Sequence, residues 1–155
     1  MTKLRQNLYF MKPVQILLIE DNEGDIFLTT EALKEAKITN EVTVIKDGWE
    51  AIQYMEEKGK YSNRILPDII LLDVNLPKMN GQEVLLNLKS NDKTKSIPII
   101  ILTTSSSKRD IVESYTNKAN CFITKPVEAT NFLKVISSIE DFWISIVQLP
   151  TRAKN

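Results

Sequence analysis

Five short apolar runs recur along the chain, each followed by polar positions. The runs are Val14–Ile19, Glu41–Ile45, Ile69–Leu72, Ile97–Leu102 and Cys121–Thr124. Each run has the length of a strand, and the first is continuous rather than alternating in polarity and is β-branched in part. Runs of this kind are typical of parallel strands that are buried on both faces. The pattern therefore predicts five strands.

Segments with helical spacing follow the runs. Their apolar positions recur at intervals of three and four residues, which places them on one face of a helix. The expected inward residues, helix by helix, are Ile26, Thr29, Leu33 and Ala36; Ala51, Ile52 and Met55; Val84, Leu85 and Leu88; Ile111, Val112 and Tyr115; and Phe132, Val135, Ile136 and Ile139. The last helix begins near Glu128, and its apolar stripe continues through Trp143 and Ile146.

This alternation of strands and helices indicates the fold class. Strands that alternate with helices pair in parallel through right-handed crossovers. Five such units predict an α/β fold: a flavodoxin-like, doubly wound, five-stranded parallel sheet in the order 2-1-3-4-5, with five helices. The 155 residues fit a single domain. We expect this domain to span residues 14–150, including an extended last helix, between tails at 1–13 and 151–155.

Polar side chains stand where four of the predicted strands end. Glu20 and Asp21 follow the first strand and Asp73 follows the third. Thr103 follows the fourth strand and Lys125 the fifth. Because the carboxyl ends of parallel strands meet at one edge of the sheet, we expect these side chains to converge there. Three carboxylates, a hydroxyl and an ammonium group suit a divalent cation and a phosphoryl group.

Each of these residues also has a purely structural interpretation. Asp73 can cap a turn, and Glu20-Asp21 can cap the helix that follows. Lys125 can be a solvated surface group, and Thr103 can belong to an ordinary polar loop. Their convergence favours the functional interpretation, in which Asp73 is a carboxylate nucleophile that forms an acyl phosphate.

Composition excludes several classes of function. Twenty basic and twenty acidic residues leave no net charge, which argues against a nucleic-acid partner bound through bulk electrostatics. The chain has no histidine, which excludes histidine catalysis, histidine metal ligands and an internal phosphohistidine. Its single Cys121, which we assign to the core, cannot form an internal disulfide and fits a reducing cytoplasm. No apolar run approaches the ~20 residues of a membrane span.

Five motifs follow one another in a fixed order at the predicted strand ends. They are Ile19-Glu20-Asp21-Asn22, Leu72-Asp73-Val74-Asn75-Leu76-Pro77, Met79-Asn80-Gly81, Leu102-Thr103-Thr104 and Phe122-Ile123-Thr124-Lys125-Pro126. On these motifs the chain resembles the receiver domain of two-component response regulators. With Asn120-Cys121 and the terminal Ile139-Glu140-Asp141-Phe142-Trp143 added, it is similar to the small stand-alone regulators paired with cyanobacterial phytochrome kinases.

The resemblance implies a metal site and a phosphoacceptor. Asp73 would accept the phosphoryl group. A Mg²⁺ ion (or Mn²⁺) would be held by Asp21, Asp73 and the backbone carbonyl of Asn75, and by Glu20 through a water. Glu20 stands where the family more often has aspartate, which a water-mediated contact tolerates.

The resemblance also implies residues that switch the conformation and residues that control the lifetime of the acyl phosphate. Thr103 and Lys125 would sense the phosphoryl group, and the Lys125-Pro126 bond is commonly cis in the family. Phe122 stands where many receivers have tyrosine, so this aromatic residue must act by packing alone. Asn75 and Ser105 would tune the rate at which water attacks the acyl phosphate.

The implied function is that of a stand-alone response regulator. A sensor histidine kinase, here of phytochrome type, would transfer a phosphoryl group to Asp73, and a surface change would signal to a downstream protein or phosphotransfer partner. The regulator would catalyse its own phosphorylation and dephosphorylation without being an enzyme for a separate substrate. Two alternatives stay open: a binding module that does not use phosphorylation, and an aspartate-nucleophile phosphatase. The phosphatase needs a second acid two residues after Asp73, where this chain has Asn75.

The stripe on the last helix also predicts a homodimer. Phe142, Trp143, Ile146 and Val147 exceed what is needed to cover a five-stranded sheet. Apolar patches of that size are unusual on a monomer, and a two-fold contact is the commonest way to cover them. We expect the interface on the face formed by the fourth helix, the fifth strand and the last helix. Folding of the tail back over its own domain is the alternative.

Overall fold

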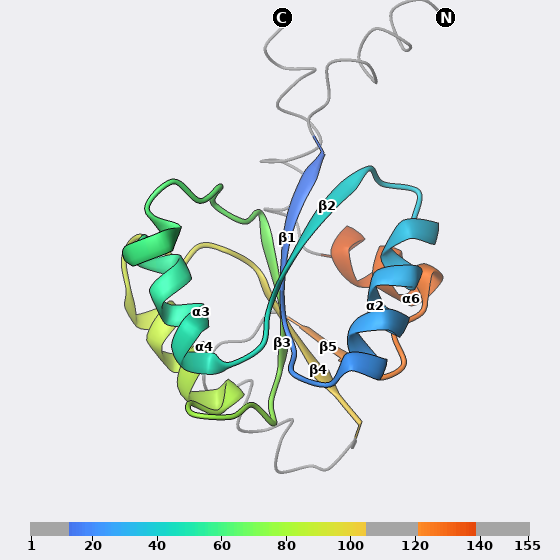
Figure 1. The fold of residues 1–155 in the computed structure, drawn as a ribbon. Helices are drawn as coiled ribbons and strands as arrows, with labels where there is room; N and C mark the ends of the chain where they lie inside the picture. Colours follow the sequence, from blue (N-terminus) through green and yellow to red (C-terminus); the bar gives the residue numbers. More distant parts are fainter. Residues whose placement is uncertain (1–12, 105–120, 139–155) are drawn as a thin grey trace, which may run out of the picture.

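The computed structural model of the chain describes residues 13–104 and 121–138, in which helices cover both faces of a central sheet (Figure 1). The sheet consists of β1 (Val14–Ile19), β2 (Asn40–Ile45), β3 (Ile69–Asp73), β4 (Ile99–Thr103) and β5 (Cys121–Thr124). All neighbouring strands are parallel, and their order is β2-β1-β3-β4-β5. The predicted fold class and strand order are therefore confirmed.

The register of the strands places their carboxyl ends side by side. Ile19 pairs with Ile45 and Leu72, while Asp73 pairs with Leu102. Thr103 in turn pairs with Thr124. The residues that end β1, β3, β4 and β5 consequently share one edge of the sheet.

Four helices lie within the described residues, two on each face of the sheet (Figure 1). Helices α3 (Gly48–Met55) and α4 (Gly81–Ser90) cover one face, and α2 (Glu23–Glu35) and α6 (Ala129–Ser137) cover the other. A short 3₁₀ turn, η1, spans Gly59–Tyr61. The helix expected around residues 111–115 lies outside the described part of the chain. Helix α6 ends at Ser137, and the expected continuation of its stripe to residues 139–147 also lies outside it.

Three of these helices, α2, α3 and α4, have a side-chain cap at the N-terminus, near the edge of the sheet where the strands end. The side chain of Asn22 accepts a hydrogen bond from the backbone N–H of Asp25 (2.9 Å) at the start of α2. Asp47 does the same for α3, and Asn80 forms a reciprocal capping box with Glu83 at the start of α4. Such caps satisfy backbone donors that a helix leaves unpaired at its N-terminus.

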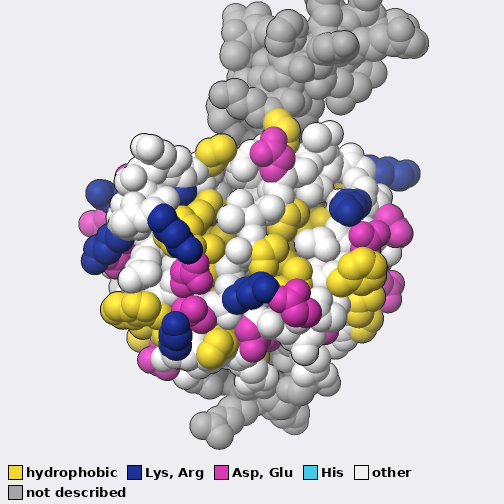
Figure 2. All heavy atoms as spheres, viewed as in Figure 1, with side chains coloured by type: hydrophobic (Ala, Val, Ile, Leu, Met, Phe, Trp, Pro, Cys, Tyr) yellow, Lys and Arg dark blue, Asp and Glu magenta, His cyan; other side chains and the backbone are white. Residues whose placement is uncertain are grey.

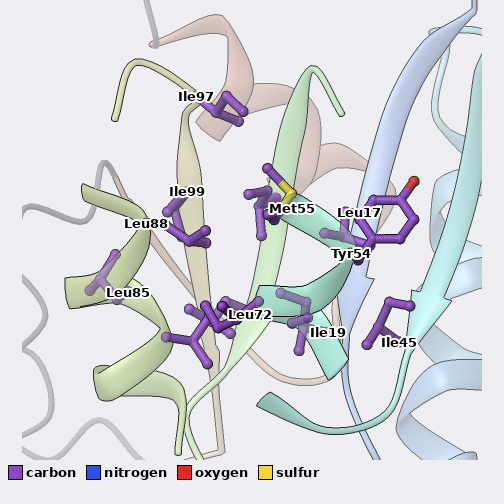
Figure 3. Packing of buried hydrophobic residues seen from close by; sticks show 14 of the residues in the cluster. Leu17, Ile19, Ile45, Tyr54, Met55, Leu72, Leu85, Leu88, Ile97 and Ile99 are labelled. Atoms are coloured by element: carbon purple, nitrogen blue, oxygen red, sulfur yellow. The ribbon is translucent and has the colours of Figure 1, made fainter. Parts of the chain in front are cut away.

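Successive residues of the strands point alternately into two hydrophobic cores, one on each face of the sheet. Leu17, Ile19 and Leu72 belong to the core beneath α3 and α4, and Figure 3 shows them in the layer of side chains that also contains Met55, Leu85 and Leu88 of those helices. Ile16 and Leu18, which point the other way, pack with residues of α2 and α6 in the second core. Because both faces are covered, β1, β3 and β4 need continuous apolar sequences, as the pattern predicted.

Most predicted inward positions are buried. Those with little exposure are Thr29, Leu33, Ala51, Ile52, Met55, Val84, Leu85, Leu88, Phe132 and Ile136, while Ile26, Ala36 and Val135 are partly buried. The boundaries of three strands differ from those of the apolar runs, and β3 and β4 also include Asp73 and Thr103, the polar residues that follow the runs. Strand β4 begins at Ile99 rather than Ile97, next to Pro98, which has no N–H for the ladder. Strand β2 begins one residue early, at Asn40, and Cys121 is only partly buried.

Charges of both signs are mixed over the surface. On the face viewed in Figure 2, basic side chains lie next to acidic ones. Several of them form exposed ion pairs, such as Lys46 with Glu23 and Lys34 with Glu31. Exposed pairs of this kind contribute about 0–1 kcal/mol each. Within residues 13–104 and 121–138, no helix has the length and apolar character needed to cross a bilayer.

Candidate functional site

The carboxyl ends of four strands bring the predicted site residues together. Glu20 directly follows β1, and its backbone N–H bonds to the carbonyl oxygen of Ile45 at 2.9 Å. Lys125 directly follows β5, and its N–H bonds to the carbonyl oxygen of Thr103 at 2.7 Å. Asp73 and Thr103 are the last residues of β3 and β4. The backbone of the sheet therefore fixes where each of these side chains starts.

Three carboxylates form one cluster at this edge. Glu20, Asp21 and Asp73 each offer an oxygen, and these oxygens lie within 4.8 Å of one another. Glu20 and Asp73 are buried, with 0% and 4% of their surface exposed, whereas Asp21 is exposed. One carboxylate oxygen of Glu20 (Oε2) accepts the backbone N–H groups of Asp21 and Asn22 at 3.1 and 3.3 Å. The cluster thus has two fixed buried acids and one that faces solvent.

Lys125 is the cation of the site. Its Nζ lies 2.7 Å from Oε1 of Glu20, 2.8 Å from Oδ2 of Asp25 and 3.4 Å from Oδ1 of Asp73. Burial alone would lower the pKa of Lys125, but the hydrogen bonds to Asp25 and Glu20 and the charge of Asp73 raise it above its usual range. The ammonium group therefore stays protonated and compensates part of the buried negative charge.

Asp73 is the carboxylate whose titration the site perturbs most. Burial raises the pKa of Asp73 to about 7, and the neighbouring Glu20 acts in the same direction. The charge of Lys125 and a hydrogen bond from the backbone of Asn75 oppose this shift. In the metal-free protein, the carboxyl group of Asp73 thus loses its proton only around neutral pH.

This shift predicts a pH-dependent stability for the metal-free protein. The folded state binds the proton of Asp73 more tightly than the unfolded state, whose pKa is the ordinary 3.8. Stability from this group is therefore present at low pH and is lost as the pH rises from about 4 to about 7, by at most ~4 kcal/mol.

Chemical denaturation in EDTA between pH 4 and 8 measures this loss. The Asp73→Asn variant, which has no such proton, is the reference, and its advantage over the wild-type protein should grow across the window. A constant difference between the two proteins would contradict the prediction.

The remaining predicted site residues lie around this cluster. Thr103 is buried at the end of β4, and Phe122 is partly buried and packs against the core beneath α3 and α4. Asn75 is exposed in the loop after β3, two residues beyond Asp73. The Lys125-Pro126 peptide bond is cis. Ser105, the second residue expected to tune lifetime, lies outside the described residues.

Two glycines let the loop after β3 pack closely against the site. A Cβ on Gly81 would clash with the backbone carbonyl of Asp73, and one on Gly48 would clash with the carbonyl of Met79. The backbone N–H of Gly48 also donates to the carbonyl oxygen of Pro77 at 3.4 Å. The loop that follows the central aspartate is therefore held between the first residues of α3 and α4.

Asp25 is a residue of the site that was not predicted from the sequence. This residue lies in the first turn of α2, where an acid is ordinarily explained by the helix dipole. In the structure its carboxylate instead pairs with Lys125, one hundred residues away. The sequence carries no signal for this pairing, because Asp25 occupies an ordinary position for an acid in the first turn of a helix.

The acidic cluster fits a divalent cation. Its donors are all carboxylate oxygens, with no nitrogen or sulfur ligand, and such a set suits Mg²⁺ or Mn²⁺.

Known proteins share this fold and much of this sequence. Residues 16–137 match the family described as "Response regulator receiver domain". Response regulator Rcp1 of Synechocystis sp. is 41% identical over 138 residues, which cover 89% of this chain and 94% of Rcp1. The crystal structure of the phosphorylated cyanobacterial phytochrome response regulator RcpA is 42% identical, with a TM-score of 0.73 over 86% of this chain and 96% of RcpA. The Mn²⁺-bound form of Rcp1 is 40% identical, with a TM-score of 0.70 over 84% of this chain and 94% of that structure.

Proposed function

Because the chain belongs to the response regulator receiver domain family, we propose that it accepts a phosphoryl group on Asp73 from a sensor histidine kinase. By its family it is a phosphoacceptor signalling protein rather than an enzyme that turns over a separate substrate. The observation that carries the proposal is the placement of Asp73: a buried carboxylate at a strand end, next to two further acids and 3.4 Å from the ammonium group of Lys125.

The chemistry of the transfer follows from this arrangement. An oxygen of the ionised Asp73 attacks the phosphorus of a phosphohistidine, the P–N bond breaks, and the electron pair goes to the leaving imidazole. Lys125 stabilises the negative charge on the phosphoryl oxygens, and the hydrogen bond from the Asn75 backbone orients the nucleophile. Since the receiver supplies these groups itself, small phosphodonors should also react.

A divalent cation completes the proposed site. Asp21, Asp73 and the carbonyl oxygen of Asn75 would hold Mg²⁺ or Mn²⁺, with Glu20 contributing through a water. When bound, the cation would neutralise charge on the transferred group. The Mn²⁺-bound form of Rcp1, a relative, supports this part of the proposal.

The proposed signal is a change in packing at the end of β4. Thr103 would move its hydroxyl toward the phosphoryl group, and Phe122 would fill the space that is vacated. This is a two-state element biased by a local change of charge. Asn75, exposed next to Asp73, and Ser105 would control how fast water removes the phosphoryl group.

The partner that delivers the phosphoryl group has a candidate surface on α2. Phe27 and Leu28 of this helix are 61% and 49% exposed, and the helix begins at the site itself. Figure 2 shows hydrophobic side chains gathered over α2. The likeness to RcpA, a cyanobacterial phytochrome response regulator, supports a kinase of phytochrome type. A cytoplasmic location of both proteins is part of the proposal.

Phosphotransfer profiling tests the proposed function. A phytochrome-type kinase and unrelated histidine kinases, each carrying labelled phosphohistidine, are mixed briefly with the protein and Mg²⁺. The label should move to the receiver within seconds from the phytochrome-type kinase and more slowly from the others. No transfer from any kinase, together with no reaction with acetyl phosphate, would refute the proposal. It would favour a binding module that does not use phosphorylation.

Asn75 weighs against the phosphatase alternative. A phosphatase with an aspartate nucleophile needs an acid two residues later to protonate the leaving group, and an amide cannot do so. Steady turnover of a phosphomonoester by this protein would restore the alternative.

A homodimer remains a prediction for this chain. Phe132 and Ile136 of α6 are buried within the domain, so they cannot form the interface. The residues that would form it, Phe142, Trp143, Ile146 and Val147, lie outside the described part of the chain. Size-exclusion chromatography with light scattering at tens of micromolar should give twice the 17.7 kDa mass of one chain. A monomer both with and without a phosphoryl mimic would contradict the prediction.

A further inference from the structure

We propose that Asp25 is a positioning residue that holds Lys125 in the unphosphorylated protein and competes for it with the incoming phosphoryl group. The inference rests on the proposed function, because it concerns the lysine that would bind the phosphoryl oxygens. It adds a residue outside the acidic cluster and predicts the direction in which that residue acts.

An ammonium group has three N–H donors, and three carboxylates surround Lys125. Its two short contacts are to Glu20 and Asp25, at 2.7 and 2.8 Å. The contact to Asp73, where the phosphoryl group would arrive, is longer, at 3.4 Å. Lys125 is therefore drawn toward the α2 side of the site and away from the reacting carboxylate. These two contacts engage two of its three donors, and a movement of Nζ toward phosphoryl oxygens on Asp73 would lengthen them.

Asp25 is the partner that Lys125 can release at lower cost. The side chain of Glu20 is fully buried, and loss of its cation would leave an uncompensated charge away from water. The side chain of Asp25 is 28% exposed, so water can replace the lost hydrogen bond. Its position in the first turn of α2 also favours the negative charge after release.

Removal of the Asp25 carboxylate should therefore strengthen phosphoryl binding. An uncharged side chain at this position holds the N–H donor of Lys125 less tightly than a carboxylate does, and one negative charge disappears from the surroundings of a group that is itself an anion. Both changes act in the same direction. A partly exposed charge pair of this kind is worth on the order of 1 kcal/mol, which corresponds to an affinity change of about fivefold.

Calorimetric titration with beryllofluoride, a phosphoryl mimic, tests the inference at saturating Mg²⁺. Asp25→Asn should lower the Kd of the mimic by about fivefold. Asp25→Glu restores the carboxylate on a longer side chain, and its Kd should return toward that of the wild-type protein. Glu23→Gln is the matched control, because it removes a charge from the same helical turn but pairs with Lys46 rather than Lys125. Its Kd should stay unchanged.

The outcomes separate the inference from the function on which it rests. If the wild-type protein binds the mimic and Asp25→Asn binds it equally or more weakly, the competition is refuted while the phosphoacceptor site stands. An equal gain in Glu23→Gln would also refute it, because the effect would then be general electrostatics. If the wild-type protein does not bind the mimic at all, the inference falls together with the proposed function.

Discussion

The Asp73→Asn variant should carry no acid-stable, hydroxylamine-labile phosphoryl group after incubation with a phosphorylated kinase or with acetyl phosphate. An amide oxygen cannot form the acyl phosphate, and no other carboxylate of the site is placed like Asp73. Asp21 is exposed, and both oxygens of Glu20 are occupied, by Lys125 and by backbone N–H groups. We therefore expect complete loss of the label rather than its transfer to a neighbouring acid.

Asp68→Asn provides the matched control for this experiment. Asp68 stands at the other end of the same strand, directly before β3, and accepts a hydrogen bond from the backbone N–H of Gln15 at 2.8 Å. Its replacement changes the same functional group outside the site, so labelling should persist. Full labelling of Asp73→Asn would remove Asp73 as the phosphoacceptor. Loss of label in both variants would point to damage of the fold instead.

The second large effect is expected from Lys125→Met. This change removes the cation but keeps most of the volume of the side chain, and it leaves the buried carboxylates of Glu20 and Asp73 unpaired. Breaking a buried pair in this way costs about 3–5 kcal/mol. We expect a loss of that size in the free energy of unfolding, measured in EDTA at pH 8. The loss should shrink at pH 5, where Asp73, with its raised pKa, takes up a proton.

Addition of Mg²⁺ tests whether the loss of stability arises at the acidic cluster. If the acidic cluster binds the cation, millimolar Mg²⁺ should restore much of the stability of Lys125→Met, because the divalent cation supplies positive charge in place of the missing ammonium group. Lys46→Met is the control: Lys46 pairs with Glu23 on the surface, with 58% of its side chain exposed, and its loss should change stability little. A stable Lys125→Met protein, or one that Mg²⁺ leaves unaffected, would contradict the role given to this lysine.

The central strands could be predicted from the sequence because a strand that is buried on both faces has a continuous apolar run. The run Val14–Ile19 coincides with β1, since all positions of this strand except Gln15 belong to one core or the other. The start of β4 was placed two residues early because Ile97 is also buried, although it precedes the ladder. Apolar character reports burial, whereas a strand boundary depends on hydrogen bonding, which Pro98 interrupts.

The sequence predicted those site residues that directly follow or end a strand. Glu20, Asp21 and Asp73 interrupt or end apolar runs, so their positions along the chain indicated their meeting in space. Asp25 gave no such signal because it occupies an ordinary position for a helical acid. The second role of Glu20 was also missed. One of its oxygens holds the backbone after β1 and the other holds Lys125, and such a division depends on side-chain geometry.

The position of Lys125 along the chain has a consequence for synthesis. The acids of the site belong to the first half of the polypeptide, and β1 and β3 pair directly. Their cation arrives only after the fifth and outermost strand has left the ribosome and joined β4. A nascent chain that ends before Lys125 thus carries the electrostatic repulsion of the mature centre without its internal counter-charge. Addition of β5 completes the sheet and also brings Lys125 to the acids. The attraction between Lys125 and these acids therefore favours the complete domain over a four-stranded intermediate.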